Sequence, residues 1–284
     1  MRTLVFGGTG IVGRATVGAA RRRGWPALGL AQEQADIERP GEVAAALAAF
    51  RPELVVNCAA LTQVDACERA RERAFAVNGA AVGNVAAACA RAGARLVHIS
   101  TDYVFDGAAA EPYREEHPTG PRSVYGASKL DGERRALELD GALVVRTSWI
   151  FGAGGSHFVD TIRGLIAAGR APLRVVADQV GAPTYARFLA RALLDLGESG
   201  VAGVVHYQNR EPVSWYEFAL EIARMSGARV AVEPVSTAEF PRPAPRPAYS
   251  VLSVARFEAL TGRPVEDWRR GLAEYVQEME SKTS

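Results

Sequence analysis

The chain is poor in cysteine and carries no long hydrophobic run. Its three cysteines, Cys58, Cys67 and Cys89, form no Cys-x-x-Cys pair, which excludes a disulfide framework and a cysteine zinc site. The apolar stretch Thr3–Phe6 reaches glycine too early for a signal peptide or a membrane span. We therefore expect a cytoplasmic protein with reduced thiols and no membrane contact.

An excess of charge of either sign is also missing. Lys and Arg number 33 against 32 Asp and Glu, a formal net charge of +1, so nothing draws the whole chain to nucleic acid or to an anionic membrane. Any anionic ligand must be held locally. With 284 residues and 48% hydrophobic content, the chain is long enough for one large domain or two unequal ones at roughly 150 residues each.

Short apolar runs alternate with longer alanine-rich segments through the first half of the chain. This alternation is typical of βαβ units, in which a parallel sheet is covered by helices on both faces. The predicted strands are Thr3–Phe6, Ala27–Leu30, Leu54–Asn57, Arg95–Ile99 and Leu143–Arg146, and the predicted helices are Ile11–Arg23, Glu42–Phe50, Ala70–Arg91 and Ala127–Leu139. The sequence thus predicts an α/β fold with a Rossmann-type doubly wound parallel sheet.

The alternation weakens after Gly152. We assign residues 1–150 to a dinucleotide-binding domain, which we expect to receive part of residues 180–210 as well. Residues 151–284 are predicted to form mainly a smaller C-terminal α/β substrate-binding domain. The four alternating prolines of Phe240–Ala248 predict an extended connector, since proline fits neither a helix interior nor a central strand.

A glycine-rich turn follows the first predicted strand. The stretch from Gly7 to Gly13 satisfies Gly-x-x-Gly-x-x-Gly, and from Gly8 it also satisfies Gly-x-Gly-x-x-Gly. Glycine permits a tight turn and close approach of the backbone to a diphosphate, whose charge meets the positive end of the next helix. We therefore assign to a dinucleotide cofactor the residues Gly7, Gly10, Ile11, Val12 and Gly13.

The choice between NAD(H) and NADP(H) stays open at this stage. An NAD site would place an acid on the adenosine ribose after the second strand, but Leu30 is followed by Ala31-Gln32-Glu33-Gln34. Glu33 could take that place, or Arg14 could receive a 2′-phosphate, although either residue also suits a solvated surface. NADP(H) is favoured and NAD(H) remains possible. Asp36 and Ile37 are expected to cover the adenine.

Tyr125 and Lys129 form a Tyr-x-x-x-Lys pair, four residues apart and hence on one face of a helix. A phenol of pKa near ~10 is a poor acid at neutral pH unless a nearby cation stabilises its phenolate. Lys129 and Lys282 are the only two lysines, and Lys282 lies among the last three residues. A chance pair is therefore improbable, and Lys129 is also expected to bind cofactor ribose hydroxyls.

Thr101 follows the fourth predicted strand, at the edge where open α/β sheets bind ligands. Its hydroxyl can hydrogen-bond a substrate carbonyl. Serine and threonine are also common turn residues after a strand. The catalytic interpretation of Thr101 therefore depends on the presence of Tyr125 and Lys129 further along the chain. Together the three residues predict a Thr–Tyr–Lys catalytic triad.

These residues resemble the extended short-chain dehydrogenase/reductases, and among them most the dTDP-4-dehydrorhamnose reductase family. The likeness runs through most of the chain. Beyond the glycine turn and the triad it rests on Val56–Asp65, Ala74–Asn78, Ser100–Gly107, Arg146–Gly152 and Asp178–Thr184. The resemblance implies NAD(P)H-dependent reduction of the C4 keto group of dTDP-4-dehydro-L-rhamnose, a nucleotide-sugar.

The resemblance also implies roles for particular residues. Ala60, Leu61 and Thr62 would line the cofactor, Thr101 and Asp102 would contact the deoxysugar, and Trp149 would lie on the substrate side of the cleft. Leu61 departs from the family, in which tyrosine or histidine is common, and this puts the packing near the nicotinamide in doubt. A homodimer is an expectation of the same kind.

Two other classes of function remain. One is a nucleotide-sugar epimerase or 4,6-dehydratase of the same superfamily, although such dehydratases carry Asp-Glu where this chain has Asp102-Tyr103. The other is a non-catalytic NADP-binding protein similar to the regulatory subunit of methionine adenosyltransferase, because fold does not fix function.

Several further residues are interpreted as structural or left unassigned. His98, His117, His157 and His206 lack metal-ligand spacing, so we predict no metal site. Trp25, Trp215 and Trp268 are interpreted as packing residues. Candidates for gripping the diphosphate of the substrate, none of them assigned, are Arg163, Arg187 and Arg246.

Overall fold

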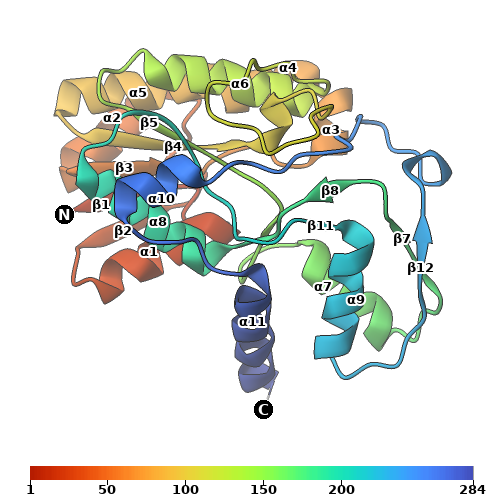
Figure 1. Cartoon of the computed structure of the whole chain (residues 1–284). Helices are drawn as coiled ribbons and strands as arrows, with labels where there is room; N and C mark the ends of the chain where they lie inside the picture. Colours follow the sequence, from red (N-terminus) through yellow and green to blue (C-terminus); the bar gives the residue numbers. More distant parts are fainter. Residues whose placement is uncertain (284) are drawn as a thin grey trace.

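A parallel sheet lies at the centre of the computed structural model, which describes residues 1–283 (Figure 1). Within that range six strands form one sheet in the order β10-β5-β4-β3-β1-β2, with every neighbouring pair parallel. The strands are β1 (Thr3–Phe6), β2 (Ala27–Leu30), β3 (Leu54–Asn57), β4 (Arg95–Thr101), β5 (Leu143–Thr147) and β10 (Gly203–His206). The predicted α/β, doubly wound fold is confirmed.

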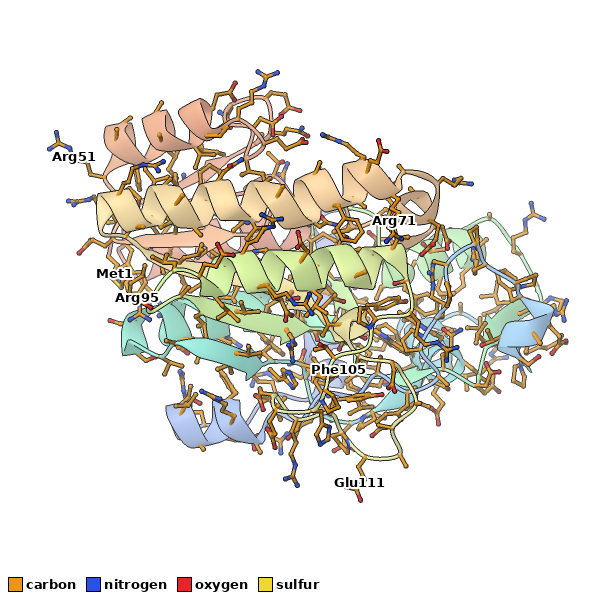
Figure 2. The ribbon with its side chains drawn as sticks, turned by 90° about the horizontal axis from the view of Figure 1, so that it is seen from above. Met1, Arg51, Arg71, Arg95, Phe105 and Glu111 are labelled. Carbon is orange, nitrogen blue, oxygen red and sulfur yellow. The ribbon has the colours of Figure 1, made fainter. Side chains whose placement is uncertain are left out.

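Helices cover both faces of this sheet (Figures 1 and 2). One face carries α1 (Ile11–Arg22) and α8 (Ala186–Ser199), and the other carries α2 (Pro40–Phe50), α5 (Ala81–Ala92) and α6 (Val124–Leu137). Side chains alternate between the two apolar layers, so that Val5 packs into one layer while Leu4 and Phe6 pack into the other. Burial on both faces explains why these strands are apolar throughout.

The helical segment before β4 differs from the prediction. A single helix over Ala70–Arg91 was expected, but the chain forms α3 (Val64–Arg69), α4 (Arg71–Phe75), a π-helical turn η1 (Ala76–Ala80) and then α5. The chain is helical from Arg71 to Ala92, close to the predicted range, but the π-helical turn η1 interrupts the α-helical pattern and turns Asn78 towards Leu61. The non-helical backbone at Ala70 separates this helix from α3, which was not predicted. Such π turns are frequent at functional sites.

A smaller lobe stands beside the sheet (Figure 1). Its β7 (Leu173–Val176) pairs with β12 (Val232–Val235), and α7 (Phe158–Ala167) packs on α9 (Trp215–Met225). The remaining elements are the 3-10 turns η2 (Asp102–Val104) and η3 (Thr237–Glu239), the short strands β6 (Ile150–Phe151), β8 (Val180–Gly181), β9 (Thr184–Tyr185) and β11 (Val213–Ser214), and the helices α10 (Ala255–Thr261) and α11 (Trp268–Thr283). None of the helices described for residues 1–283 could cross a bilayer.

The proline-rich segment Phe240–Ala248 is an extended connector, as predicted, with no helix or strand among these described residues. The Asp65 carboxylate at the start of α3 fixes it, since it accepts hydrogen bonds from the Ala244 amide and the Arg246 guanidinium. The connector thus ties the smaller lobe back to the sheet. We keep the division near residue 150 as a proposal, with α8 and β10 assigned to the sheet domain.

Candidate active site

The glycine turn lies between the end of β1 at Phe6 and the start of α1 at Ile11. Gly7 has φ +70°, a conformation that favours glycine. A Cβ on Gly13 would lie 2.1 Å from the Gly7 carbonyl oxygen, so α1 can approach the turn only because this residue has no side chain. A Cβ on Gly10 would meet nothing closer than 3.5 Å, which leaves open space in front of the helix.

The start of α1 is free to receive an anion. Among the described residues no side chain caps this helix end, and its first turn carries no acidic residue. Ile11 and Val12 line the cleft at this point. Unpaired backbone N–H groups and the positive end of a helix bind phosphate groups. The turn therefore fits the diphosphate of a dinucleotide.

Acidic side chains gather at one end of the cleft, beyond β2. Asp36 lines it, and its carboxylate accepts a hydrogen bond of 3.0 Å from the Glu38 amide, which holds the pKa of Asp36 below its ordinary value. Ile37 and Gln32 line the same end. The two residues considered for cofactor choice lie elsewhere: Glu33 is exposed outside the cleft lining, and the Arg14 guanidinium donates to the Thr9 carbonyl.

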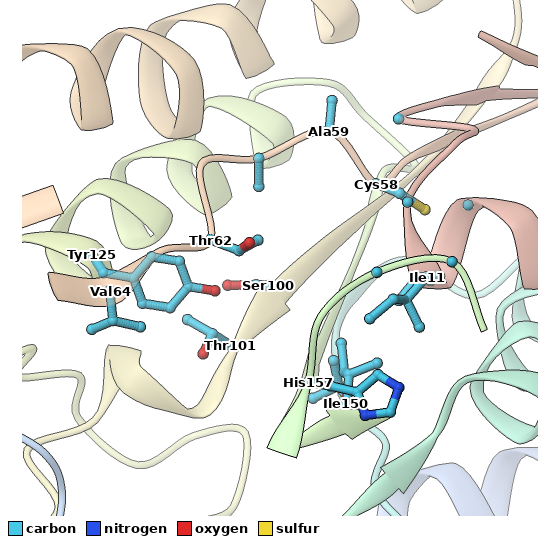
Figure 3. A pocket seen from close by; sticks show the side chains of 18 of the residues that line it. Ile11, Cys58, Ala59, Thr62, Val64, Ser100, Thr101, Tyr125, Ile150 and His157 are labelled. Atoms are coloured by element: carbon cyan, nitrogen blue, oxygen red, sulfur yellow. The ribbon is translucent and has the colours of Figure 1, made fainter. Parts of the chain in front are cut away.

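Tyr125 sits in the first turn of α6. Ser123 caps this helix by accepting a hydrogen bond from the Gly126 amide, so α6 begins three residues before the predicted start at Ala127. The Tyr125 hydroxyl points towards Ser100 and Thr101 at the end of β4 (Figure 3). Burial raises the pKa of Tyr125, while the contact with Thr101 opposes that rise. Tyr125 is therefore a neutral phenol at physiological pH, and it lines the cleft.

Asp102 follows Thr101 and is 3% exposed at the wall of the cleft. The Thr101 hydroxyl donates to Asp102 Oδ1 at 2.9 Å, whereas Asp102 Oδ2 has no hydrogen-bond partner among the described residues. Burial raises the pKa of Asp102 to about 6, although the Ser250 and Thr101 hydroxyls act in the opposite direction. A buried carboxylate oxygen without a partner is costly, and such atoms call for an explanation such as a ligand contact.

Lys129 lies one turn further along α6 and is only 3% exposed. Its amine donates to the Ile99 carbonyl at 2.6 Å and lies 3.4 Å from His98 Nε2. It does not line the cleft, and no hydrogen bond joins it to Tyr125 in the part of the chain that the structure describes. Burial lowers the pKa of Lys129 to about 8, although Glu133 acts in the opposite direction.

The cleft itself has a volume of about 630 Å³ and runs along the carboxyl ends of β1 to β5. This is the edge where doubly wound sheets bind ligands. Of the residues assigned from the sequence, those that line it are Gly7, Gly10, Ile11, Val12, Gly13, Asp36, Ile37, Ala60, Thr62, Thr101, Asp102, Tyr125 and Trp149. The structure brings these residues together, and it places Leu61 and Lys129 behind the surface of the cleft.

Leu61 contributes its backbone to this wall more than its side chain. Its amide donates to Asn78 Oδ1 at 2.7 Å, and its carbonyl accepts from Asn78 Nδ2 at 3.0 Å. The side chain packs against the cluster of Cys67, Ala74 and Val124. Asn78 also donates to the Ser128 hydroxyl, so its amide groups hold the loop on α6.

Two tryptophans form the other end of the cleft. Trp149 follows β5 with φ +44°, a strained conformation for a bulky residue, and its ring lies where a Cβ on Gly181 would come within 2.5 Å. Trp215 begins α9 in the smaller lobe, and it lines the cleft as well. Its interpretation as a packing residue is therefore incomplete, because the ring is part of the cleft wall.

Comparison with known proteins settles the family. Residues 1–281 match the family described as RmlD substrate binding domain. The chain belongs to this family. It is 43% identical to a dTDP-4-dehydrorhamnose reductase of Mycobacterium tuberculosis (strain ATCC 25618 / H37Rv), over 100% of this chain and 95% of the relative. A spore coat polysaccharide biosynthesis protein, SpsK of Bacillus subtilis, is 41% identical over 99% of this chain and 98% of its own length.

A solved structure of the same family agrees over the whole fold. The dTDP-4-dehydrorhamnose reductase from Bacillus anthracis, in complex with NADP, matches with a TM-score of 0.94 and 35% identity, covering 98% of this chain and 99% of that one. The resemblance to the dTDP-4-dehydrorhamnose reductase family inferred from the sequence motifs is therefore confirmed for this RmlD-family chain.

Other candidates from the sequence lie outside the cleft of this RmlD-family protein. Arg187 pairs with Glu278 on α11, and Arg163 on α7 lies near Tyr275. Arg246 pairs with Asp65 at 2.9 Å. None of these arginines lines the cleft, and two of them, Arg187 and Arg246, are each held by an acidic side chain. Among the described residues no three or more His, Cys, Asp or Glu side chains are grouped as metal ligands.

Some cleft residues were missed from the sequence. Gly154, Gly155 and Ser156 line the cleft beside the start of α1, and a Cβ on Gly155 would lie 3.0 Å from the Ile11 side chain. The Gly-Ala-Gly-Gly stretch after β6 was a signal for a close approach of two backbones. Trp215 and Phe218 carried no such signal, because aromatic residues at helical spacing are equally typical of a core.

Proposed function

We propose that the protein reduces the C4 keto group of dTDP-4-dehydro-L-rhamnose with NADPH, giving dTDP-L-rhamnose. The observation that carries the proposal is the position of the Tyr125 phenol beside Thr101 in a cleft that also contains the glycine turn. Relatives named dTDP-4-dehydrorhamnose reductase, such as that of Mycobacterium tuberculosis, and the NADP complex of the Bacillus anthracis structure support it.

The cofactor would lie along the edge of the sheet. Gly10, Ile11 and Val12 would hold its diphosphate, Asp36 and Ile37 its adenosine end, and Ala60 and Thr62 its middle, with Tyr125 beside the nicotinamide riboside. Lys129 lies behind the cleft wall, where its amine is bound to the Ile99 carbonyl, and would act through Tyr125. When bound, the nicotinamide supplies the hydride that C4 receives. NADP is supported by the Bacillus anthracis complex, while the acidic side chains beside Asp36 also leave NADH as a usable cofactor.

The protein's own residues supply the proton. The Thr101 hydroxyl would turn from Asp102 to orient the C4 carbonyl, and Tyr125 would donate its phenolic proton to the oxygen as negative charge develops there. This donation completes the alcohol and leaves a phenolate on Tyr125. Lys129, one helical turn away, would stabilise that phenolate with its positive charge and then return a proton to it. Asp102 and Trp149 would hold the deoxysugar, which gives the unpartnered Asp102 oxygen a ligand.

Loss of NADPH absorbance with the purified protein tests this activity. Oxidation with dTDP-4-dehydro-L-rhamnose, and much slower oxidation with dTDP-4-dehydro-6-deoxyglucose, is the expected result. Tyr125→Phe should lose at least about 100-fold in kcat with NADPH binding retained. Tyr249→Phe is the matched control, since Tyr249 is half-buried outside the cleft.

The competing functions give different results in the same assay. Tight cofactor binding with no oxidation of NADPH by either sugar would contradict the reductase. It would favour an epimerase if the sugar changes configuration, and a regulatory NADP-binding protein if nothing reacts. A homodimer and a cytoplasmic location stay predictions, which size-exclusion chromatography with light scattering and cell fractionation would test.

A further inference from the structure

The surroundings of the Lys129 amine include a buried pair of side chains that the proposed reaction does not use. Asn57 ends β3 and His98 lies beside it on β4, and both are 0% exposed. Asn57 Nδ2 lies 3.2 Å from His98 Nδ1, and His98 Nε2 lies 3.4 Å from Lys129 Nζ. The imidazole therefore joins Asn57 to Lys129.

The orientation of the Asn57 amide determines the tautomer of His98. Asn57 Oδ1 accepts a hydrogen bond of 3.1 Å from the Ala59 amide, so the NH₂ group must face the imidazole. An NH₂ group can only donate, and His98 Nδ1 must therefore accept and carry no proton. Burial lowers the pKa of His98 well below its ordinary value, so the ring is neutral and its single proton is on Nε2.

This tautomer presents an N–H donor to the amine of Lys129. A neutral amine can accept that hydrogen bond with its lone pair and still donate to the Ile99 carbonyl. An ammonium group has no lone pair, so its own N–H groups would oppose the imidazole N–H. His98 could accept from an ammonium only if its proton moved to Nδ1, which would break the contact with Asn57.

We propose that His98, oriented by Asn57, is a positioning residue that limits how strongly the ammonium form of Lys129 is stabilised, so that this lysine can give up a proton at working pH and regain it afterwards. The functional meaning rests on the proposed reductase activity. After Tyr125 gives its proton to the product, Lys129 returns a proton to the phenolate and becomes a neutral amine, which water then protonates. A lysine whose ammonium form was strongly stabilised would return that proton slowly.

The other side chains that face the Lys129 amine are either already paired or uncharged. Glu133 faces it from the next turn of α6, but it is bound by Nε and Nη2 of Arg146 at 2.8 and 2.7 Å. Cys58 faces it after β3, and burial raises the pKa of this thiol to about 12, so it is neutral. The π-helical turn η1 adds Asn78, an uncharged residue. His98 is thus the polar side chain nearest to the amine that can set its protonation.

The tautomer can be observed directly in the wild-type protein. Long-range proton–nitrogen NMR spectra of the four histidines distinguish a protonated Nε2 from a protonated Nδ1, and His98→Leu assigns the signal. The proposal expects a neutral His98 with its proton on Nε2 throughout neutral pH. A proton on Nδ1, or a charged ring, would overturn it without the need for any folded variant beyond the one used for assignment.

The lysine itself is unusually easy to follow, because the chain has only two lysines. In Lys282→Arg protein, a carbon-13 label at Cε reports Lys129 alone. Asn57→Asp keeps the acceptor for the Ala59 amide but requires a proton on His98 Nδ1, so Nε2 becomes an acceptor for the ammonium. We expect the Lys129 titration midpoint to rise by about one pH unit or more.

Two controls separate this effect from simple charge and from general damage. Asn57→Asp combined with His98→Leu keeps the new carboxylate but lacks the imidazole, and it should lose most of the rise. His206→Gln alters another buried histidine, on β10, and should leave the midpoint unchanged. An equal rise in the double variant, or no rise in Asn57→Asp, would overturn the proposal. These measurements use no turnover, so they stand or fall independently of the reductase assay.

Discussion

The indole rings of Trp149 and Trp215 stack face to face, with centroids 3.4 Å apart and planes 6° apart. Trp149 belongs to the end of the sheet and Trp215 to α9 of the smaller lobe, so the stack joins the two parts of the protein across the cleft. Phe158 on α7 supports Trp215 from the lobe, at 4.6 Å between ring centroids. The position of Trp149 in the cleft thus depends on the lobe.

Replacement of Trp215 by leucine should therefore weaken sugar binding. An aromatic pair contributes about 0.5–1.5 kcal/mol beyond its buried area, so KM for the nucleotide-sugar should rise by up to about tenfold. KM for NADPH should stay the same, because Trp215 belongs to the smaller lobe whereas the residues proposed for the cofactor lie at the edge of the sheet. Trp25→Leu is the matched control, a half-buried tryptophan outside the cleft. Equal effects on both KM values would contradict the assignment.

The glycine turn predicts opposite effects for two alanine substitutions. Gly10 has φ −74° and open space at its Cβ, so Gly10→Ala should fold normally but obstruct the diphosphate and weaken NADPH binding by at least about tenfold. Gly13→Ala would force a Cβ to within 2.1 Å of the Gly7 carbonyl oxygen, so it should lower the Tm by several degrees. Calorimetry and fluorescence titration check the pair, and a normal affinity in Gly10→Ala would contradict the proposed binding mode.

The ionised carboxylate of Asp102 should lower the free energy of unfolding at neutral pH. Its pKa in the folded protein is about 6, above the ordinary value of 3.8, so the folded state binds the proton more tightly than the unfolded state between these values. The free energy of unfolding therefore falls as pH rises through that window, by up to about 3 kcal/mol. Asp102→Asn should raise the Tm at pH 7 and lower the activity. An unchanged or lower Tm would show that the carboxylate has partners that offset its burial.

The buried ion pair of Arg146 and Glu133 should behave differently from Asp102, because removal of one of its charges should lower the stability of the folded protein. Both side chains are nearly inaccessible, with 5% and 2% of their surface exposed. Glu133→Gln would leave a buried guanidinium without its counter-charge, which costs about 3–5 kcal/mol. Urea denaturation should show that loss, and Arg146→Met with Glu133→Leu should recover most of it. A mild effect of Glu133→Gln alone would mean that water reaches the pair.

Local sequence was sufficient for most of the sheet. The apolar runs marked the strands because both faces of each strand are buried, and the glycine turn at Gly7 was readable because no other residue fits it. The start of α6 was misplaced by three residues although its cap is local, because Ser123 accepts a hydrogen bond from the Gly126 amide only three residues further along the chain. The π-helical turn at Asn78 is held by the loop at Leu61, a contact that no local pattern reveals.

The site was harder to predict where contacts cross between distant segments. Tyr125, Thr101 and Asp102 were accessible from motif spacing. The tautomer of His98 was not, because it follows from an amide in another strand and from a loop beyond it. Likewise Arg246 was a plausible diphosphate ligand until the structure showed Asp65 as its partner.

The route of the chain limits how the cleft can move. It passes from the sheet into the lobe after β6, returns for α8 and β10, leaves again through β11 and α9, and comes back along the connector fastened to Asp65. A lobe joined by a single linker can rotate about it in a hinge motion. A lobe held by several crossings cannot swing in this way, and substrate entry must rely on small sliding movements of packed helices.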